Sequence, residues 1–98
     1  MFDVQKSEPF ATWLDSLGDT LARARVLMRL DRVEDGHFGD VGHVGEGVYE
    51  MRINHGPGYR LYYYREGESV IFMLLGGDKG SQKRDIKKAI SMANELRG

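Results

Sequence analysis

Apolar positions follow a helical period in the first third of the chain. Between residues 10 and 17 they recur at intervals of three and four, which predicts a first helix. Ser7 is placed to cap this helix, and Gly18 is placed to end it. Residues 2–5 instead alternate between apolar and polar side chains, so a short strand is expected before the helix.

A second helix is expected directly after this break. Asp19 can cap its start and Gly36 stops it, so the two helices should form a hairpin with a short connection. Arginines fill much of one side of this segment, which leaves the apolar side to face the core. The stripe assigned to the core comprises Leu21, Ala24, Leu27 and Met28, widened by Val26, Leu30 and Val33.

After Gly36 the period of the pattern falls to two residues, which is typical of strands. Residues 49–54 and 59–64 alternate, and the glycine-rich residues 55–58 between them predict a hairpin turn. Residues 69–75 are apolar on both faces, as expected of a central strand that is covered on both sides.

A last helix is predicted for residues 81–96. Its buried stripe should consist of Ile86, Ala89, Ile90 and Ala93. The complete order is β-α-α-β-β-β-α in a single domain, residues 1–98, because no linker or repeat divides the chain. This order predicts an α+β fold, in which an N-terminal helical hairpin and a C-terminal helix are segregated from a small antiparallel sheet.

The formal net charge of −1 is divided unevenly along the chain. Residues 1–50 contain 5 Lys/Arg and 10 Asp/Glu, a net of −5, whereas residues 51–98 contain 9 and 5, a net of +4. The second part could present a cationic face to an anionic partner, although charges also fall unevenly by chance. Since neither a membrane helix nor a signal peptide is visible, a cytoplasmic protein with no membrane contact is expected.

Signatures of several enzyme classes are missing. No glycine-rich loop carries Lys and Ser at P-loop spacing, and no Ser lies in a nucleophile elbow. His37, His43 and His55 are scattered, so neither a metal site nor a cofactor is expected. The chain has no cysteine, which excludes disulfides, thiolate ligands and a cysteine nucleophile.

Arginine and tyrosine residues share the polar face of the predicted hairpin. Arg52 lies on one strand, and Arg60, Tyr62 and Tyr64 lie on the next. Because burying an unpaired arginine is costly, this face should either be exposed or pair with Glu50. Guanidinium groups bind phosphate oxygens and tyrosine rings stack on bases, which together fit single-stranded nucleic acid. The alternative is an ordinary solvated sheet face with Arg–Glu pairs.

Glycine and lysine residues mark the junction between the last strand and the last helix. Gly76 and Gly77 permit a sharp turn, and Lys79 stands just ahead of a helix N-terminus, where free N–H groups attract anions. A plain strand-to-helix turn would contain the same residues. Four cations on the helix could grip RNA or simply form a solvated face: Lys83, Arg84, Lys87 and Lys88.

Several short motifs, taken together, resemble a known family. They comprise residues 45–53, the turn Gly56-Pro57-Gly58-Tyr59-Arg60, the segment Gly76-Gly77-Asp78-Lys79, and Gln82, Asp85 and Ile86. The helix start Phe10, Trp13, Leu14 and Leu17 matches as well, as do residues 36–40. In this combination the chain resembles, over nearly its whole length, the HigB-like subgroup of the RelE/ParE toxins, known as phage-derived addiction-module killer proteins.

The resemblance implies a microbial-RNase-like fold with a compact, twisted antiparallel sheet. It also implies the toxin of a type II toxin–antitoxin module, a metal-independent, ribosome-dependent mRNA endoribonuclease that inhibits translation. The implied partners are a helix-turn-helix antitoxin of the HigA type, the ribosome and mRNA. Operator DNA would be contacted through the antitoxin complex.

Such cleavage uses the 2′-hydroxyl of the RNA as the nucleophile, and the enzyme must stabilise the charge that grows on the phosphate. Under this resemblance, Arg52 and Arg60 would stabilise that charge, and Lys79 would be a third cation. Tyr62 would stack on a base or transfer a proton. The residues assigned to substrate or ribosome contacts are His55, Tyr64, Lys83, Arg84, Lys87 and Lys88.

One feature of the relatives has no counterpart in the chain. Relatives transfer protons with a late Tyr or His, whereas here no Tyr follows Tyr64 and no His follows His55. The general acid and base therefore stay unassigned at this point. Two other functions are kept open: a ParE-type poison of DNA gyrase, in which the arginines would be structural, and an inactive module that only binds the antitoxin.

Overall fold

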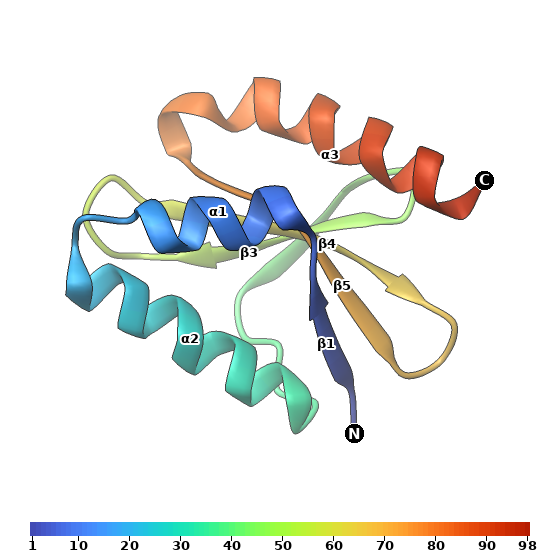
Figure 1. The fold of residues 1–98 in the computed structure, drawn as a ribbon, viewed down its shortest axis with the longest axis horizontal. Coiled ribbons are helices and arrows are strands. Elements are labelled where there is room, and N and C mark those ends of the chain that lie inside the picture. The colour runs from blue at the N-terminus through green and yellow to red at the C-terminus, as the bar shows by residue number, and fades with distance from the viewer.

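The computed structural model describes residues 1–98 as three layers, with two helices on one face of a five-stranded sheet and one helix on the other (Figure 1). The strands are β1 (Asp3–Lys6), β2 (Val41–Gly45), β3 (Val48–Ile53), β4 (Tyr59–Glu66) and β5 (Val70–Asp78). The helices are α1 (Glu8–Ser16), α2 (Thr20–Glu34) and α3 (Gln82–Arg97), the last preceded by a 3₁₀ turn, Lys79–Ser81. The α+β class is confirmed. None of the helices is both long and apolar enough to cross a membrane.

The sheet has the strand order β1-β5-β4-β3-β2 and differs from the prediction in two ways. First, β2 is an additional strand, which its glycine-rich sequence concealed because it lacks a clear apolar–polar alternation. Second, β1 runs parallel to β5, with Asp3 opposite Val70, whereas the other neighbours are antiparallel. Strand direction is set by the path of the whole chain, so a local pattern cannot reveal it.

The two predicted helix caps are confirmed. Ser7 Oγ accepts a hydrogen bond from the Phe10 amide (3.1 Å), and the same hydroxyl donates to the Leu74 carbonyl of β5 (2.7 Å). Asp19 Oδ1 accepts from two amides in the first turn of α2, at 3.0 and 3.1 Å. These side chains satisfy amides that have no partner inside the helix, so each helix starts where its cap lies.

Two apolar stripes run along α2, and only the part of the prediction that comprised Val26, Leu30 and Val33 is confirmed. The buried stripe consists of Ala22, Val26, Leu30 and Val33. Leu21, Leu27 and Met28 are 54%, 41% and 53% exposed, so their assignment to the core is wrong. Both stripes have helical spacing, and the period alone cannot choose between them. The observed rotation packs the buried stripe in the core and lets the Arg29 guanidinium donate to backbone carbonyls beyond the helix (2.6 and 2.9 Å).

Helix α3 covers the sheet face of Tyr62 and Tyr64, for which exposure was one of two predicted alternatives. Tyr62 and Tyr64 are 0% and 1% exposed and belong to a core with Ala89 and Ala93 of α3. The expected exposure of these tyrosines is therefore wrong. The small alanine side chains let the helix approach the sheet closely enough to bury both aromatic rings.

Two glycines of β5 allow helices to approach from both sides. A Cβ at Gly76 would collide with the ring of Trp13 in α1, and a Cβ at Gly77 would collide with the carboxylate of Asp85 in α3. Neighbouring strand positions point to opposite faces. The pair Gly76-Gly77 therefore brings α1 and α3 close to the same end of β5, where the candidate site lies.

Candidate functional site

The candidate site lies where the loop between β3 and β4 meets the end of β5. Arg60 pairs with Gly77 across the sheet, so Lys79 follows directly beyond the start of β4. The amide of Lys79 donates to the Gly58 carbonyl (2.8 Å). A Cβ at Gly58 would lie 3.5 Å from Arg60 Nη1 and 3.7 Å from Lys79 Cβ, which shows that both cationic residues converge on this glycine.

A pocket of about 310 Å³ opens at this convergence, and we call it the loop pocket. Its lining is Asn54, His55, Gly56, Pro57, Gly58, Arg60 and Lys79. No carboxylate and no apolar side chain larger than proline lines it. Two permanent cations, an imidazole and an amide in one small cavity are suited to a phosphate group.

His55 is held in the loop pocket by an aspartate from the connection between α1 and α2. Asp19 Oδ2 lies 2.9 Å from His55 Nε2, while Asp19 Oδ1 caps α2. The hydrogen bond with His55 is the main reason why the pKa of Asp19 lies below its usual value, and the amides of α2 add to the effect. The imidazole also stacks on the Tyr59 ring, at 6.5 Å between centroids and 20° between planes. His55 is therefore oriented by two neighbours, and its Nδ1 makes no hydrogen bond within the chain.

The buried carboxylate of Glu50 holds Arg60 in position. Glu50 is 1% exposed, and its Oε1 lies 3.8 Å from Arg60 Nε. Glu50 also accepts hydrogen bonds from Arg52 Nε (3.1 Å) and Gln82 Nε2 (2.7 Å). The expected pairing of this strand face with Glu50 is thus confirmed. Arg60 Nη1 donates to the Tyr59 carbonyl (3.1 Å), whereas its Nε is buried without a hydrogen-bond partner, so one hydrogen bond and the ion pair with Glu50 hold the guanidinium.

Arg52 does not join the loop pocket. Its guanidinium binds Asp40 (2.9 Å) as well as Glu50, and it lines a separate groove beside α2. The hydrogen bond with Asp40 is the main reason why the pKa of Arg52 is raised. Two carboxylates already neutralise this arginine, so it is less suited to bind a phosphate than Arg60.

The two candidate tyrosines are not placed to contact a substrate. Tyr62 is completely buried, its hydroxyl has no hydrogen-bond partner, and burial raises its pKa well above the ordinary value. Tyr64 is also buried, and its hydroxyl donates to Glu66 Oε2 (2.8 Å). A buried ring cannot stack on a base, so the stacking role expected of Tyr62 does not fit this structure.

The predicted helix cations form a surface next to the loop pocket. Lys83 and Arg84 join Lys79 around a second hollow at the start of α3, and Lys87 extends this surface along the helix. Lys88 is exposed but lines neither hollow. No group of three or more His, Asp or Glu side chains is placed to hold a metal ion.

Sequence reasoning missed Asp19 as part of the site. It identified this residue only as a helix cap, because Asp19 and His55 are 36 positions apart. No local motif signals a contact over that separation. The capping position was nevertheless informative, since it places the carboxylate at the tip of the helical hairpin, which faces the β3–β4 loop (Figure 1).

Two comparisons relate the chain to known proteins. Residues 12–97 match the sequence model of a family described as phage-derived protein Gp49-like (DUF891). The chain is also 40% identical, over 87 residues, to an uncharacterized protein of Haemophilus influenzae, which covers 89% of this chain and 88% of the relative. The family match includes Asp19 and the whole lining of the loop pocket.

Proposed function

Because the chain belongs to the Gp49-like family of phage-derived proteins, a family associated with addiction-module toxins, we propose that it is the toxin of a type II toxin–antitoxin module that cleaves mRNA on the ribosome. The observation that carries this proposal is the loop pocket, where Arg60, Lys79 and the Asp19–His55 pair surround one cavity. A phosphate group seated there would contact two cations and lie beside an oriented imidazole.

The arrangement supports attack by the 2′-hydroxyl of the RNA. Asp19 holds Nε2 of His55 in its N–H form, which leaves the lone pair of Nδ1 to accept the 2′-hydroxyl proton. The 2′-oxygen then bonds to phosphorus, and the bond from phosphorus to the 5′-oxygen breaks. The leaving oxygen takes a proton from water, so the products are a 2′,3′-cyclic phosphate and a 5′-hydroxyl.

Arg60 and Lys79 supply the positive charge that this step requires. The phosphate gains negative charge as the 2′-oxygen approaches, and cations held in place beforehand stabilise that charge without rearranging. Glu50 keeps the Arg60 guanidinium in position. In this mechanism Arg52, Tyr62 and Tyr64 have structural roles.

The partners follow from the same proposal. The ribosome would present mRNA to the loop pocket, and Lys79, Lys83 and Arg84 would contact ribosomal or messenger phosphates beside it. Lys87 and Lys88 would extend this contact. A helix-turn-helix antitoxin would neutralise the toxin and carry it to operator DNA.

The test is induced expression in a bacterial host, with mRNA 5′ ends mapped within minutes. The informative variant is Asp19→Asn, because asparagine caps a helix as well as aspartate but cannot balance an imidazolium. We expect Asp19→Asn to reduce cutting about 100-fold or more, the typical contribution of general acid–base catalysis, while the variant stays folded because asparagine still caps α2. Lys79→Ala should also reduce cutting, whereas its matched control, Lys6→Ala on β1, should not.

Two results would overturn the proposal. Growth arrest with intact messages and blocked DNA replication would indicate a gyrase poison. Expression of the wild-type chain without growth arrest would indicate a module that only binds its partner.

A further inference from the structure

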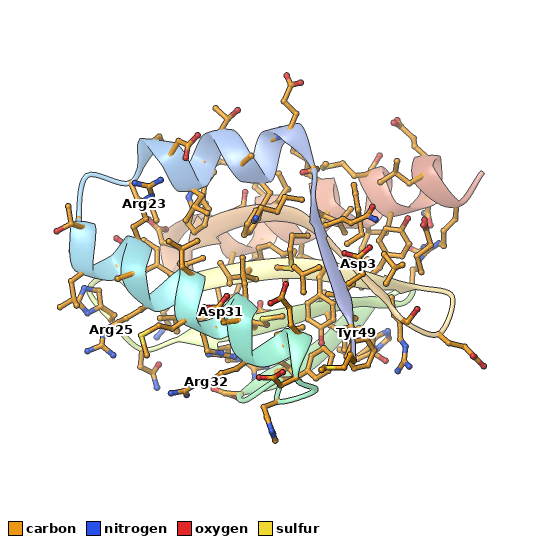
Figure 2. All side chains as sticks on the ribbon, turned by 60° about the horizontal axis from the view of Figure 1, so that its bottom comes forward. Asp3, Arg23, Arg25, Asp31, Arg32 and Tyr49 are labelled. Atoms are coloured by element: carbon orange, nitrogen blue, oxygen red, sulfur yellow. The ribbon has the colours of Figure 1, made fainter.

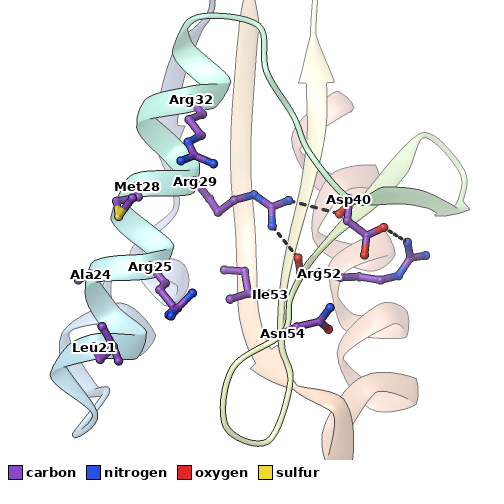
Figure 3. A pocket seen from close by; sticks show the side chains of 10 residues that line it. All are labelled: Leu21, Ala24, Arg25, Met28, Arg29, Arg32, Asp40, Arg52, Ile53 and Asn54. Atoms are coloured by element: carbon purple, nitrogen blue, oxygen red, sulfur yellow. Dashed lines mark hydrogen bonds and ion pairs between the residues drawn. The ribbon is translucent and has the colours of Figure 1, made fainter.

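A second and larger cavity lies between α2 and the end of β3, and we call it the α2 groove (Figure 3). It measures about 500 Å³. Leu21, Ala24 and Met28 of α2 contribute its apolar part, together with Ile53 of β3. The proposed nuclease chemistry uses none of these residues.

The α2 groove carries an excess of positive charge that the chain itself does not neutralise. Arg25, Arg29 and Arg32 project from α2 into it, and none of the three forms an ion pair (Figure 3). Its one carboxylate, Asp40, is already bound to Arg52 at 2.9 Å. Arg25 and Arg32 also reach the molecular surface (Figure 2). An incoming carboxylate would therefore meet unpaired guanidinium groups.

Arg29 forms the floor of this charged region. Its guanidinium donates to the carbonyls of Arg52 (2.6 Å), Phe38 (2.9 Å) and Asp40 (3.3 Å), and its Nε is buried without a partner. Burial is the main reason why the pKa of Arg29 is lowered. Carbonyl groups hold the side chain in place without cancelling its charge, so Arg29 adds to the attraction for an anion.

The apolar part of the α2 groove is exposed along one line of the helix. Leu21 is 54% exposed and Met28 is 53% exposed, and Ala24 lies between them at helical spacing. Leu21, Ala24 and Met28 thus form a stripe that no other element of the chain covers. Helix-in-groove recognition uses Leu and Met at such spacing, and the flexible methionine adapts to the partner.

We propose that the α2 groove binds an acidic amphipathic helix of a partner protein. The apolar face of that helix would pack on Leu21, Ala24 and Met28, and carboxylates at its border would pair with Arg25 and Arg32. This interaction does not depend on nuclease activity.

An extended peptide fits the α2 groove less well, because strand addition needs free backbone groups. The carbonyls of Asp40 and Arg52, which line the groove, already accept from Arg29, and the Asp40 carbonyl accepts from the Arg52 amide as well (2.9 Å). Side chains rather than an open sheet edge therefore form the binding surface.

Single-stranded RNA also fits less well. Sites for single strands combine cations with aromatic rings on which bases stack, and no aromatic residue lines the α2 groove. If RNA occupied the groove, the exposed parts of the Leu21 and Met28 side chains, over half of each residue's surface, would stay in contact with water or lie against a phosphate backbone. A helix with an apolar face removes this surface from water.

The α2 groove adjoins the loop pocket. Asn54 lines both cavities, so a helix seated in the groove would lie next to the loop pocket. A partner bound there is in position to restrict access of RNA to the loop pocket.

The test uses fluorescence anisotropy with the full chain. The probe is a fluorescein-labelled helical peptide of about 18 residues, with Leu at intervals of three and four and Glu at the flanking positions. We expect saturable binding, weakened about tenfold or more when Lys replaces Glu in the peptide. The variants Met28→Ser and Arg25→Glu/Arg32→Glu should weaken binding to a similar extent. These side chains are exposed and make no ion pair, so folding should be unaffected.

Arg23→Glu is the control for charge reversal on the same helix outside the groove; the ion pair with Asp15 that it removes (3.3 Å) joins two exposed side chains and contributes little to stability. It should leave peptide binding unchanged. The inference would be overturned by no saturable binding of the acidic peptide, or by equal effects of Arg23→Glu and the groove variants. It would also be overturned if a single-stranded RNA oligonucleotide bound in the groove in place of the peptide. Because the readout is binding, a negative result here is distinct from the absence of mRNA cleavage.

Discussion

Replacing Glu50 by alanine tests the buried charge network that positions Arg60. The Glu50 side chain is 2% exposed and the Arg60 side chain 10%, so the substitution leaves a guanidinium in a nearly dry environment. The remaining hydrogen bond of Arg60, to the Tyr59 carbonyl, does not balance its charge. Removing one partner of a buried ion pair costs about 3–5 kcal/mol, because the other charge stays buried and unpaired.

The loss of the contact with Arg52 adds little to this figure. The Arg52 side chain is 35% exposed and keeps Asp40 as a partner, so water and a second carboxylate compensate. Gln82 loses one hydrogen bond, worth about 1 kcal/mol. We therefore expect Glu50→Ala to lower the free energy of unfolding by about 4 kcal/mol, a large part of the stability of a domain this size.

The assay is urea denaturation followed by the fluorescence of Trp13, the single tryptophan of the chain. Glu68→Ala is the matched control, since this exposed side chain makes no ion pair, and it should change stability by less than about 0.5 kcal/mol. A double variant, Glu50→Leu/Arg60→Met, removes both charges and should be more stable than Glu50→Ala. The reasoning fails if Glu50→Ala costs less than about 1 kcal/mol, or if the double variant is the less stable of the two.

Two further predictions concern titratable groups. Tyr62→Phe removes a buried hydroxyl that has no hydrogen-bond partner, so the free energy of unfolding should stay equal or rise. Cleavage of mRNA should persist in this variant. A loss of cleavage would show that the Tyr62 hydroxyl takes part in catalysis. The pKa of Asp19 lies below its usual 3.8 in the folded chain, so its carboxylate stabilises the fold above that pH and loses this effect as the solution is acidified through the lowered pKa. His55→Ala removes the largest cause of the shift, and a carboxyl ¹³C titration by NMR should show the Asp19 pKa rising; an unchanged value would contradict the hydrogen bond.

Much of the fold could be predicted because its signals are local. Ser7 and Asp19 are capping residues directly before apolar periods, and the continuous apolar run in β5 marks a central strand. What could not be predicted depends on contacts between distant segments. The exposed stripe through Leu21 and Met28 has the same spacing as the buried one, and contacts with distant segments distinguish them: the core packing of Val26 and the hydrogen bonds of Arg29 to distant carbonyls.

The candidate site was predicted in part. Arg60 and Lys79 lie together at the loop pocket, because the turn after β3 and the end of β5 meet at one end of the sheet. Tyr62 was misjudged because alternation along a strand shows which side chains share a face, but not whether a helix covers that face. Asp19 was missed because its second carboxylate oxygen meets His55 only after folding.

The two oxygens of the Asp19 carboxylate have different functions, and this separation affects how members of the family can diverge. One oxygen starts a helix, which an asparagine amide would do equally well. The other gives the His55 imidazole its counter-charge, which an amide does not provide. A change from an aspartate codon to an asparagine codon needs a single nucleotide substitution. A relative could therefore lose its catalytic activity while its fold and its surfaces stay intact. We expect lineages that retain a harmless copy to show this exchange at position 19 before they show damage to the core.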